Sequence, residues 1–205
     1  MRYRLLPVLA AVILTAAAAS ADEIPHSIAG FTLGQPIEAV SGRVLMTTAL
    51  PVRYMENLRE VEIRPVAGFK SGLIAYGTCR RPEQIVRIKL KYADESREFF
   101  EDLLKRYKNR FGKPDEYRGD PFGVLVSWKW SFSEPNGNRI SLVLQHNQQD
   151  EDEKLGNAVK LTLANRLEED ADCARRRPDH RRDPAPGTAA PAGEKAEWDA
   201  LIPAR

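Results

Sequence analysis

The segment QIVRIKLKY, residues 84–92, decides the fold of this chain because its residues alternate in character. From Val86 onward the even-numbered positions are apolar or aromatic, whereas the odd-numbered positions carry Arg87, Lys89 and Lys91. A period of two places these two sets on opposite faces of a strand, one buried and one exposed. The basic face could contact acidic headgroups or an anionic polysaccharide. Two plainer interpretations stay open: an ordinary solvated face, or lysines that protect an edge strand from aggregation.

Similar patterns on both sides of this segment predict further elements of a sheet. Strands are expected at 60–64, 73–76, 124–132, 139–146 and 158–163, with a hairpin loop at Asn136-Gly137. A long helix is expected after Asp94 as its N-cap, because aromatic and leucine residues recur every fourth position up to Phe111 before Gly112 and Pro114. Shorter helices are expected at 35–40 and 165–173.

This order of elements predicts an α+β domain, in which an antiparallel sheet packs against one long helix and shorter helices. We expect a signal peptide at residues 1–21, a single domain at 22–173 and a disordered C-terminal tail at 174–205. The length of the middle segment is enough to bury a core without help from metals or disulfides.

The N-terminus has the pattern of a secretory signal peptide. Arg2 and Arg4 precede an apolar run that ends at Ala18, and small residues follow up to a cleavage site after Ala21. A retained anchor is the alternative, although the run is short for a membrane span and no later run is longer. Cleavage removes two of the 31 basic residues and none of the 29 acidic ones, which leaves a formally neutral mature chain. We therefore expect a periplasmic or secreted protein that binds no nucleic acid and has no transmembrane segment after cleavage.

The tail combines an arginine-rich start with an apolar end. Five arginines lie between Arg175 and Arg182, and a stretch rich in Pro, Ala and Gly follows. Trp198, Leu201 and Ile202 would share one face of a helical turn, which suits docking into a groove of an envelope protein partner. The alternative is that this cluster folds back on its own domain or has no role.

Cys79 and Cys173 are the two cysteines, and in an oxidising compartment we expect them to form a disulfide. Two unpaired thiols, or a reactive Cys79 next to Arg80 and Arg81, are the alternatives. Their spacing matches neither a redox motif nor a haem-attachment motif.

No pattern predicts a catalytic, cofactor or metal site. We expect His146 to be a surface histidine at a strand end, and the acidic stretch 150–153 to be a solvated loop and not a calcium site. Trp128 and Trp130 share a strand face that suits core packing, with stacking on a ligand as the alternative.

Two short motifs carry a family resemblance. The stretch Phe31-Thr32-Leu33-Gly34, followed by Ile37 and Val40, and the stretch RFGKPD at 110–115 resemble the helix start and helix stop of SmpA/BamE-like αβ domains of outer-membrane assembly lipoproteins. The chain resembles still more an uncharacterised family of secreted proteobacterial proteins. The lipid-accepting cysteine of the lipoproteins has no counterpart near Ala21, so the resemblance implies a fold but no functional residue.

These observations favour a non-catalytic binding or envelope-associated protein. The alternative is a periplasmic enzyme with an unrecognised active site, and a third hypothesis has the arginine-rich tail bind an anionic polymer. A deep pocket with several convergent ionisable groups would favour the enzyme, whereas a flat or grooved sheet surface would favour the binding protein.

Overall fold

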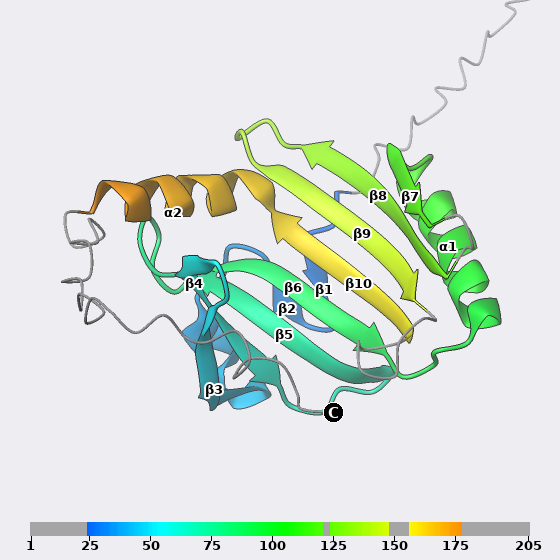
Figure 1. Ribbon diagram of the computed structural model, residues 1–205, viewed down its shortest axis with the longest axis horizontal. Helices are drawn as coiled ribbons and strands as arrows, with labels where there is room; N and C mark the ends of the chain where they lie inside the picture. Colours follow the sequence, from blue (N-terminus) through cyan, green and yellow to red (C-terminus); the bar gives the residue numbers. More distant parts are fainter. Residues whose placement is uncertain (1–23, 121–123, 148–155, 178–205) are drawn as a thin grey trace, which may run out of the picture.

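The computed structural model describes residues 24–120, 124–147 and 156–177. An eight-stranded antiparallel sheet dominates it, with the strand order β3-β4-β5-β6-β10-β9-β8-β7 (Figure 1). Its strands are β3 (Val44–Val52), β4 (Met55–Ile63), β5 (Phe69–Gly77), β6 (Ile85–Tyr92), β7 (Glu116–Gly119), β8 (Leu125–Ser133), β9 (Arg139–Asn147) and β10 (Gly156–Leu163). The other elements are β1 (Ser27–Ile28), β2 (Phe31–Thr32), the 3-10 helix η1 (Ile37–Arg43), α1 (Arg97–Phe111) and α2 (Ala164–Arg176).

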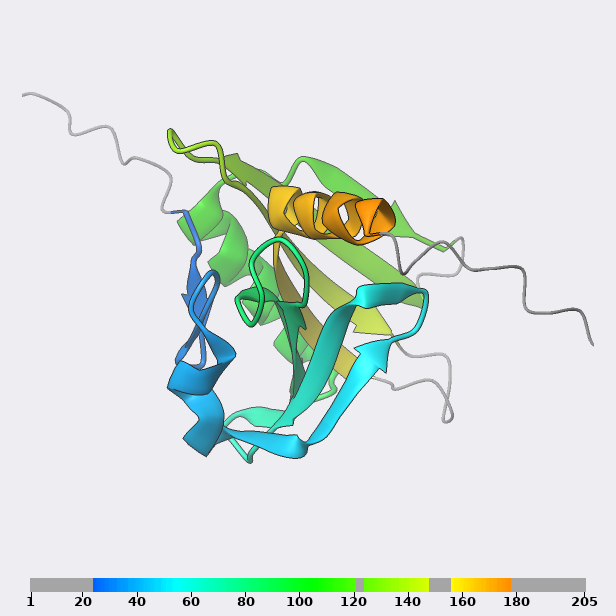
Figure 2. The same cartoon turned by 90° about the vertical axis from the view of Figure 1, so that its left-hand side faces the viewer.

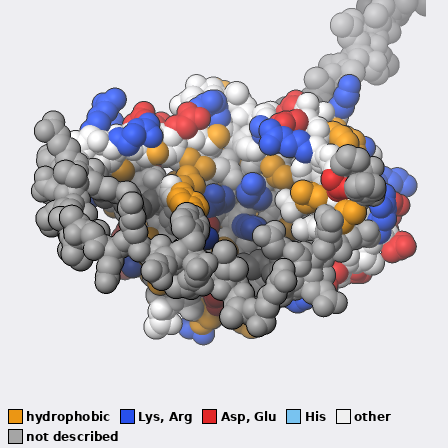
Figure 3. Space-filling model, viewed as in Figure 1, with side chains coloured by type: hydrophobic (Ala, Val, Ile, Leu, Met, Phe, Trp, Pro, Cys, Tyr) orange, Lys and Arg blue, Asp and Glu red, His pale blue; other side chains and the backbone are white. Residues whose placement is uncertain are grey.

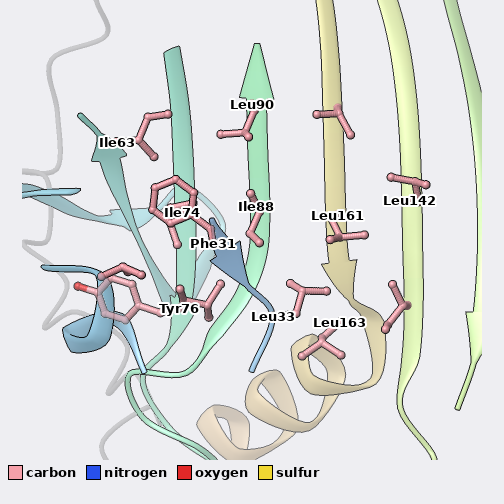
Figure 4. Packing of buried hydrophobic residues seen from close by; sticks show 14 of the residues in the cluster. Phe31, Leu33, Ile63, Ile74, Tyr76, Ile88, Leu90, Leu142, Leu161 and Leu163 are labelled. Carbon is pink, nitrogen blue, oxygen red and sulfur yellow. The ribbon is translucent and has the colours of Figure 1, made fainter. Parts of the chain in front are cut away.

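Alternation along the central strands gives the sheet one apolar and one polar face. On β6, Ile88 and Leu90 are fully buried, while Arg87 and Lys89 between them are half-buried. Ile88 lies opposite Leu161 of β10 and Ile74 of β5, so the apolar side chains of neighbouring strands meet on the same face. Figure 4 shows this layer of packed side chains, which forms the core.

The apolar face is covered by the N-terminal segment and by α1. Phe31 of the β1–β2 ribbon is fully buried, and it packs with Leu33 over the sheet (Figure 4). Figure 2 shows the β1–β2 ribbon and η1 on one side of the sheet and α2 on the other. No large apolar layer covers the second face among the described residues, because the core residues lie on the first.

Helix α1 begins two residues later than the sequence pattern predicts. Its N-cap is Ser96, whose hydroxyl accepts from the Phe99 amide at 3.3 Å, and Asp94 instead accepts from the Ser96 amide and hydroxyl. The helix ends at Gly112, where φ is 75°, as the glycine predicts. The indole of Trp130 donates to the Gly112 carbonyl at 3.0 Å, which ties this end to β8.

The expectation of an α+β domain built on one long helix is wrong. About half of the described residues lie in strands and about a quarter in helices, so the protein is mostly β. The longest helix, α1, has 15 residues and buries only Phe100 fully, while the β1–β2 ribbon and η1 supply much of the cover. Helical periodicity predicts that a helix exists, but it does not show how much of the sheet the helix covers.

The strands that the sequence analysis misses are short or irregular. β1 and β2 have two residues each and β7 has four, which is too short for a period of two to be recognised. β3 is an edge strand whose pairing with β4 shifts register, so its apolar residues do not alternate. The predicted helix at 35–40 is the 3-10 helix η1, and the predicted helix at 165–173 is α2, which extends to Arg176.

A buried carboxylate fixes α2 against the loop between β5 and β6. Asp170 of α2 is 2% exposed, and its Oδ1 accepts from the amides of Cys79 at 3.0 Å and Arg80 at 2.6 Å. Its Oδ2 accepts from the Thr78 amide at 3.2 Å and from the Asn57 side chain at 3.3 Å. Four donors therefore satisfy one buried charge, and the backbone of the loop depends on it.

The disulfide lies beside this carboxylate and confirms the pairing of Cys79 with Cys173. The two Cα atoms are 5.8 Å apart, and the bond joins residues separated by 94 positions. Gly77 comes so close to Asp170 that an added Cβ would lie 3.0 Å from its Oδ1. The bond, the carboxylate and the glycine together hold α2 at one end of the sheet.

We expect Asp170→Ala to lower the free energy of unfolding by roughly 2–4 kcal/mol, because it leaves buried amide donors without an acceptor. Denaturant titration of the disulfide-bonded protein measures this loss. Asp172→Ala is the matched control on the same helix: Asp172 is exposed and pairs only with Arg175, so its loss should cost less than about 1 kcal/mol. Equal losses for the two variants would contradict the anchoring role of Asp170.

Candidate functional site

The predicted basic row lies in the middle of the sheet. Arg87, Lys89 and Lys91 project from the polar face of β6, which is hydrogen-bonded to β5 on one side and β10 on the other. β6 is therefore no edge strand, and the interpretation of these residues as guards against edge aggregation is wrong. Each of the three side chains is half-buried, so the row lies on the floor of a concave surface.

Strand register extends this row across the sheet. Lys89 lies directly opposite Lys160 of β10, which in turn lies opposite Val143 of β9. Val143 lies opposite Lys129 of β8, so three lysines occur within four successive strands on one face. We call Lys89, Lys160 and Lys129 the lysine row. Directly opposite residues have Cβ atoms only about 5 Å apart, which brings the first two ammonium groups into one neighbourhood.

A hollow of about 490 Å³ lies over this part of the face, and α2 forms one of its walls. Figure 3 shows basic side chains gathered in the middle of the hollowed surface. A neighbouring hollow of about 430 Å³ includes Lys89 and Lys91 in its lining. We call the first hollow, together with Lys89, the basic groove. Its lining residues are Arg87, Glu116, Arg118, Ser127, Lys129, Ser141, Val143, Gln145, Lys160, Thr162, Ala164 and Leu167.

Acidic residues neutralise some of these charges but not the central pair. Arg87 pairs with Glu60 at 2.6 Å, and Glu116 contacts both Arg118 and, at 3.4 Å, Lys129. Within the described ranges, no carboxylate lies within ion-pair distance of Lys89 or Lys160. The fold thus places two uncompensated like charges directly opposite each other.

The electrostatic effect of this arrangement is a lowered pKa of Lys160. Partial desolvation in the groove lowers the pKa of Lys160, and repulsion from Arg87, Lys89, Lys129 and Arg118 lowers it further. Like charges at directly opposite sheet positions destabilise the folded state. An anion bound between the two ammonium groups would remove this repulsion.

The groove suits binding through charge and hydrogen bonds. Lysines supply mobile positive charges, while the hydroxyls of Ser127, Ser141 and Thr162 can donate from the floor. The only acidic residue among its described lining residues is Glu116, which is already engaged with Arg118 and Lys129. The lining therefore offers cations and hydroxyls but brings no free acid and base together.

Sequence reasoning found one side of this site and missed the other. Arg87, Lys89 and Lys91 were recognised by their alternation, whereas Lys129 and Lys160 were not singled out. The same signal was present, because Lys129 alternates with Trp128 and Trp130, and Lys160 with Val159 and Leu161. The alternation within a single strand does not show which strands are neighbours in the sheet.

The histidine His146 has a different environment from the one expected. His146 is 1% exposed, so the prediction of a surface histidine is wrong. Its Nδ1 lies 2.7 Å from the Asn157 amide oxygen, and we assign the proton to Nδ1 because that oxygen only accepts. The Asn157 amide nitrogen donates to the carbonyls of Asp94 and Ser96, which joins the histidine to the start of α1.

The tryptophans of β8 pack as the core interpretation predicts. Trp130 is 2% exposed and its ring lies 5.9 Å from that of Tyr107. Trp128 is half-buried between Tyr117, 4.5 Å away, and the ammonium of Lys108, 4.4 Å above its ring. Both rings are thus on the face opposite the basic groove.

Several predicted features lie outside the described residues, namely the signal peptide, the acidic stretch 150–153 and the docking residues Trp198, Leu201 and Ile202. Among the residues that the structure does describe, no three His, Cys, Asp or Glu side chains gather so as to hold a metal ion. None of the described helices is long and apolar enough to cross a membrane.

We expect Lys160→Gln to stabilise the folded protein by about 0.2–1 kcal/mol, because it removes one of two like charges at opposite sheet positions. Thermal or denaturant unfolding at low salt measures the gain, which should shrink as salt screens the repulsion. Lys89→Gln should give a similar gain, and the double variant less than the sum, because either change alone relieves the repulsion. Lys105→Gln on the exposed side of α1 is the control, and an equal gain there would contradict this account.

Comparison with known proteins leaves this site without an assigned counterpart. No family model matches the chain, no curated protein matches it, and no solved structure matches it. The resemblance to SmpA/BamE-like domains and to a family of secreted proteobacterial proteins stays a prediction. The function therefore has to be inferred from the groove itself.

Proposed function

We propose that this protein is an exported, non-catalytic binding protein that holds an anionic ligand in the basic groove. The observation that carries the proposal is the pair Lys89 and Lys160, directly opposite each other without an acidic partner among the described residues. Such a pair destabilises the fold when empty, and an anion between the two ammonium groups offsets that cost. Binding of an anion at this position is therefore favourable, because the two charges contribute nothing to the stability of the empty protein.

The shape of the site favours binding over catalysis. The groove is an open hollow on a sheet face, and its described lining has several cations but a single, already paired carboxylate. General acid–base catalysis needs a positioned proton donor and acceptor at one reacting atom. The lining supports neutralisation of a bound anion better than it supports proton transfer.

We also propose that the protein is exported from the cytoplasm. The signal-peptide pattern of residues 1–21 supports export to the periplasm or beyond the cell. The bond between Cys79 and Cys173 supports the same address, because structural disulfides persist mainly in oxidising compartments. We propose that the mature chain begins at Asp22.

We expect the double variant Lys89→Gln/Lys160→Gln to bind tripolyphosphate at least roughly tenfold more weakly than the unaltered chain from Asp22, because both charges of the central pair are lost. Isothermal titration calorimetry at low ionic strength measures the affinity. Lys105→Gln/Lys113→Gln is the matched control: both residues are exposed, lie away from the groove and remove the same net charge. An equal loss in the control, or no binding by the unaltered chain, would overturn the proposal.

A second contact through the tail remains a proposal on sequence grounds. We propose that Trp198, Leu201 and Ile202 dock into an envelope protein partner, since an apolar cluster after a polar stretch suits a groove. Because α2 extends to Arg176 and carries Cys173, a truncation that tests the tail should end at Arg177.

We expect the chain that ends at Arg177 to keep its thermal stability and its anion affinity but to lose a partner captured from envelope extract. Substitution of Trp198 by Ala in the full chain should lose the same partner, identified by mass spectrometry. Capture that is unaffected by both changes would contradict docking through the tail.

A further inference from the structure

The basic stretch across the sheet is limited at both ends by glutamates. Beyond Lys89, the next residue across the sheet on the same face is Leu73 of β5, followed by Glu62 of β4. At the other end, Glu116 of β7 lies directly opposite Lys129. The lysine row therefore lies between Glu62 at one end and Glu116 at the other, and Glu116 contacts both Lys129 and Arg118.

The length of that segment follows from strand spacing. Lys89 and Lys160 lie on adjacent strands, and Lys129 lies two strands beyond Lys160, with Val143 between them. With neighbouring strands about 4.8 Å apart, the lysine row spans roughly 14 Å. It presents a double charge at one end and, about 10 Å away, a single charge. A compact monoanion can reach only one of these two positions at a time.

The type of cation and the residues on the groove floor indicate the chemical class of the ligand. The row consists of lysines, which act as point charges and lack the planar fork that suits a single carboxylate. The two arginines of the lining, Arg87 and Arg118, are each paired with a glutamate, Glu60 and Glu116. The described residues lining the hollow include Ser127, Ser141, Gln145 and Thr162, but no aromatic side chain on which a sugar ring or base could stack. Point charges with hydroxyl donors fit a chain of phosphate groups better than a chain of acidic sugars.

The concave shape of the groove favours such a phosphate chain over a membrane surface as the ligand. Lys89 and Lys129 are half-buried and Lys160 is exposed. Lys129 and Lys160 line the hollow, and the first turn of α2 contributes Ala164 and Leu167 to its wall. In Figure 3 the basic side chains likewise lie in the hollowed part of the surface. A flat bilayer would meet the rim first, whereas a thin linear molecule can reach the floor.

We infer that the ligand of the basic groove is a linear, multiply charged phosphate chain that lies across the strands and contacts Lys129 as well as the pair Lys89 and Lys160. This inference rests on the proposed function and specifies its ligand class. Lys129 is then a selectivity residue: it separates chains long enough to span the row from short anions that contact only the central pair.

The test is a titration of the unaltered chain with phosphate chains of increasing length. Orthophosphate, pyrophosphate, tripolyphosphate and polyphosphates of defined longer lengths serve as probes, and calorimetry at constant ionic strength gives the affinities. Affinity per chain should rise until the chain spans the lysine row and then level off, because no further lysine lies in register beyond Lys89 or beyond Lys129. Lys129→Gln should lower affinity for the longer chains by about threefold to fivefold and leave that for orthophosphate and pyrophosphate unchanged.

Lys113→Gln is the control for loss of one positive charge outside the groove, and it should alter no affinity in the series. Equal affinity for orthophosphate and long chains, or an equal effect of Lys129→Gln on all lengths, would overturn the inference while leaving anion binding by the central pair intact. Tighter binding of an oligogalacturonate of matched charge would overturn the phosphate assignment. Absence of binding by every probe would overturn the proposed function itself.

Discussion

Apolar packing on only one face of the sheet is the constraint on which the other features of this structure depend. Each central strand carries its apolar residues on a single side, so the β1–β2 ribbon, η1 and α1 all lie against that side. The opposite face then has no apolar layer to cover it among the described residues, and on the central strands it carries charged and polar side chains with a few apolar ones such as Leu73 and Val143. The basic groove exists because the core is one-sided, since lysines could not be tolerated beneath a second apolar layer.

The position of α2 turns this polar face into a groove. The helix follows β10 directly and contacts β4, β6 and β9, and its first turn forms a wall of the hollow. Asp170 and the bond from Cys173 to Cys79 hold the helix at that end of the sheet, both through the loop after β5. Structural anchoring and the shape of the candidate site are therefore linked by one helix, although no anchoring residue lines the hollow.

The unfavourable placement of Lys89 opposite Lys160 is the main support for the proposed binding of an anion in the groove. Surface lysines on sheets are ordinary, and several ion pairs among the described residues are exposed on both sides and contribute little to stability. The directly opposed pair Lys89 and Lys160 differs from these ion pairs, because repulsion between two like charges lowers the stability of the folded state. Local interactions that conflict with stability are expected at functional sites, where a ligand supplies the missing partner.

The sequence by itself determined which residues of β6, β8, β9 and β10 face the core, because a period of two needs no knowledge of the partner strands. It also predicted the basic row on β6 and the pairing of Cys79 with Cys173, which the structure confirms. The predicted fold class was wrong, because strands of two to four residues and an irregular edge strand show no alternation that could be detected in the sequence. Only the tertiary structure decided that β6 and β10 are neighbours and that Lys160 faces Lys89, because strand order depends on long-range pairing and packing, which local alternation does not encode.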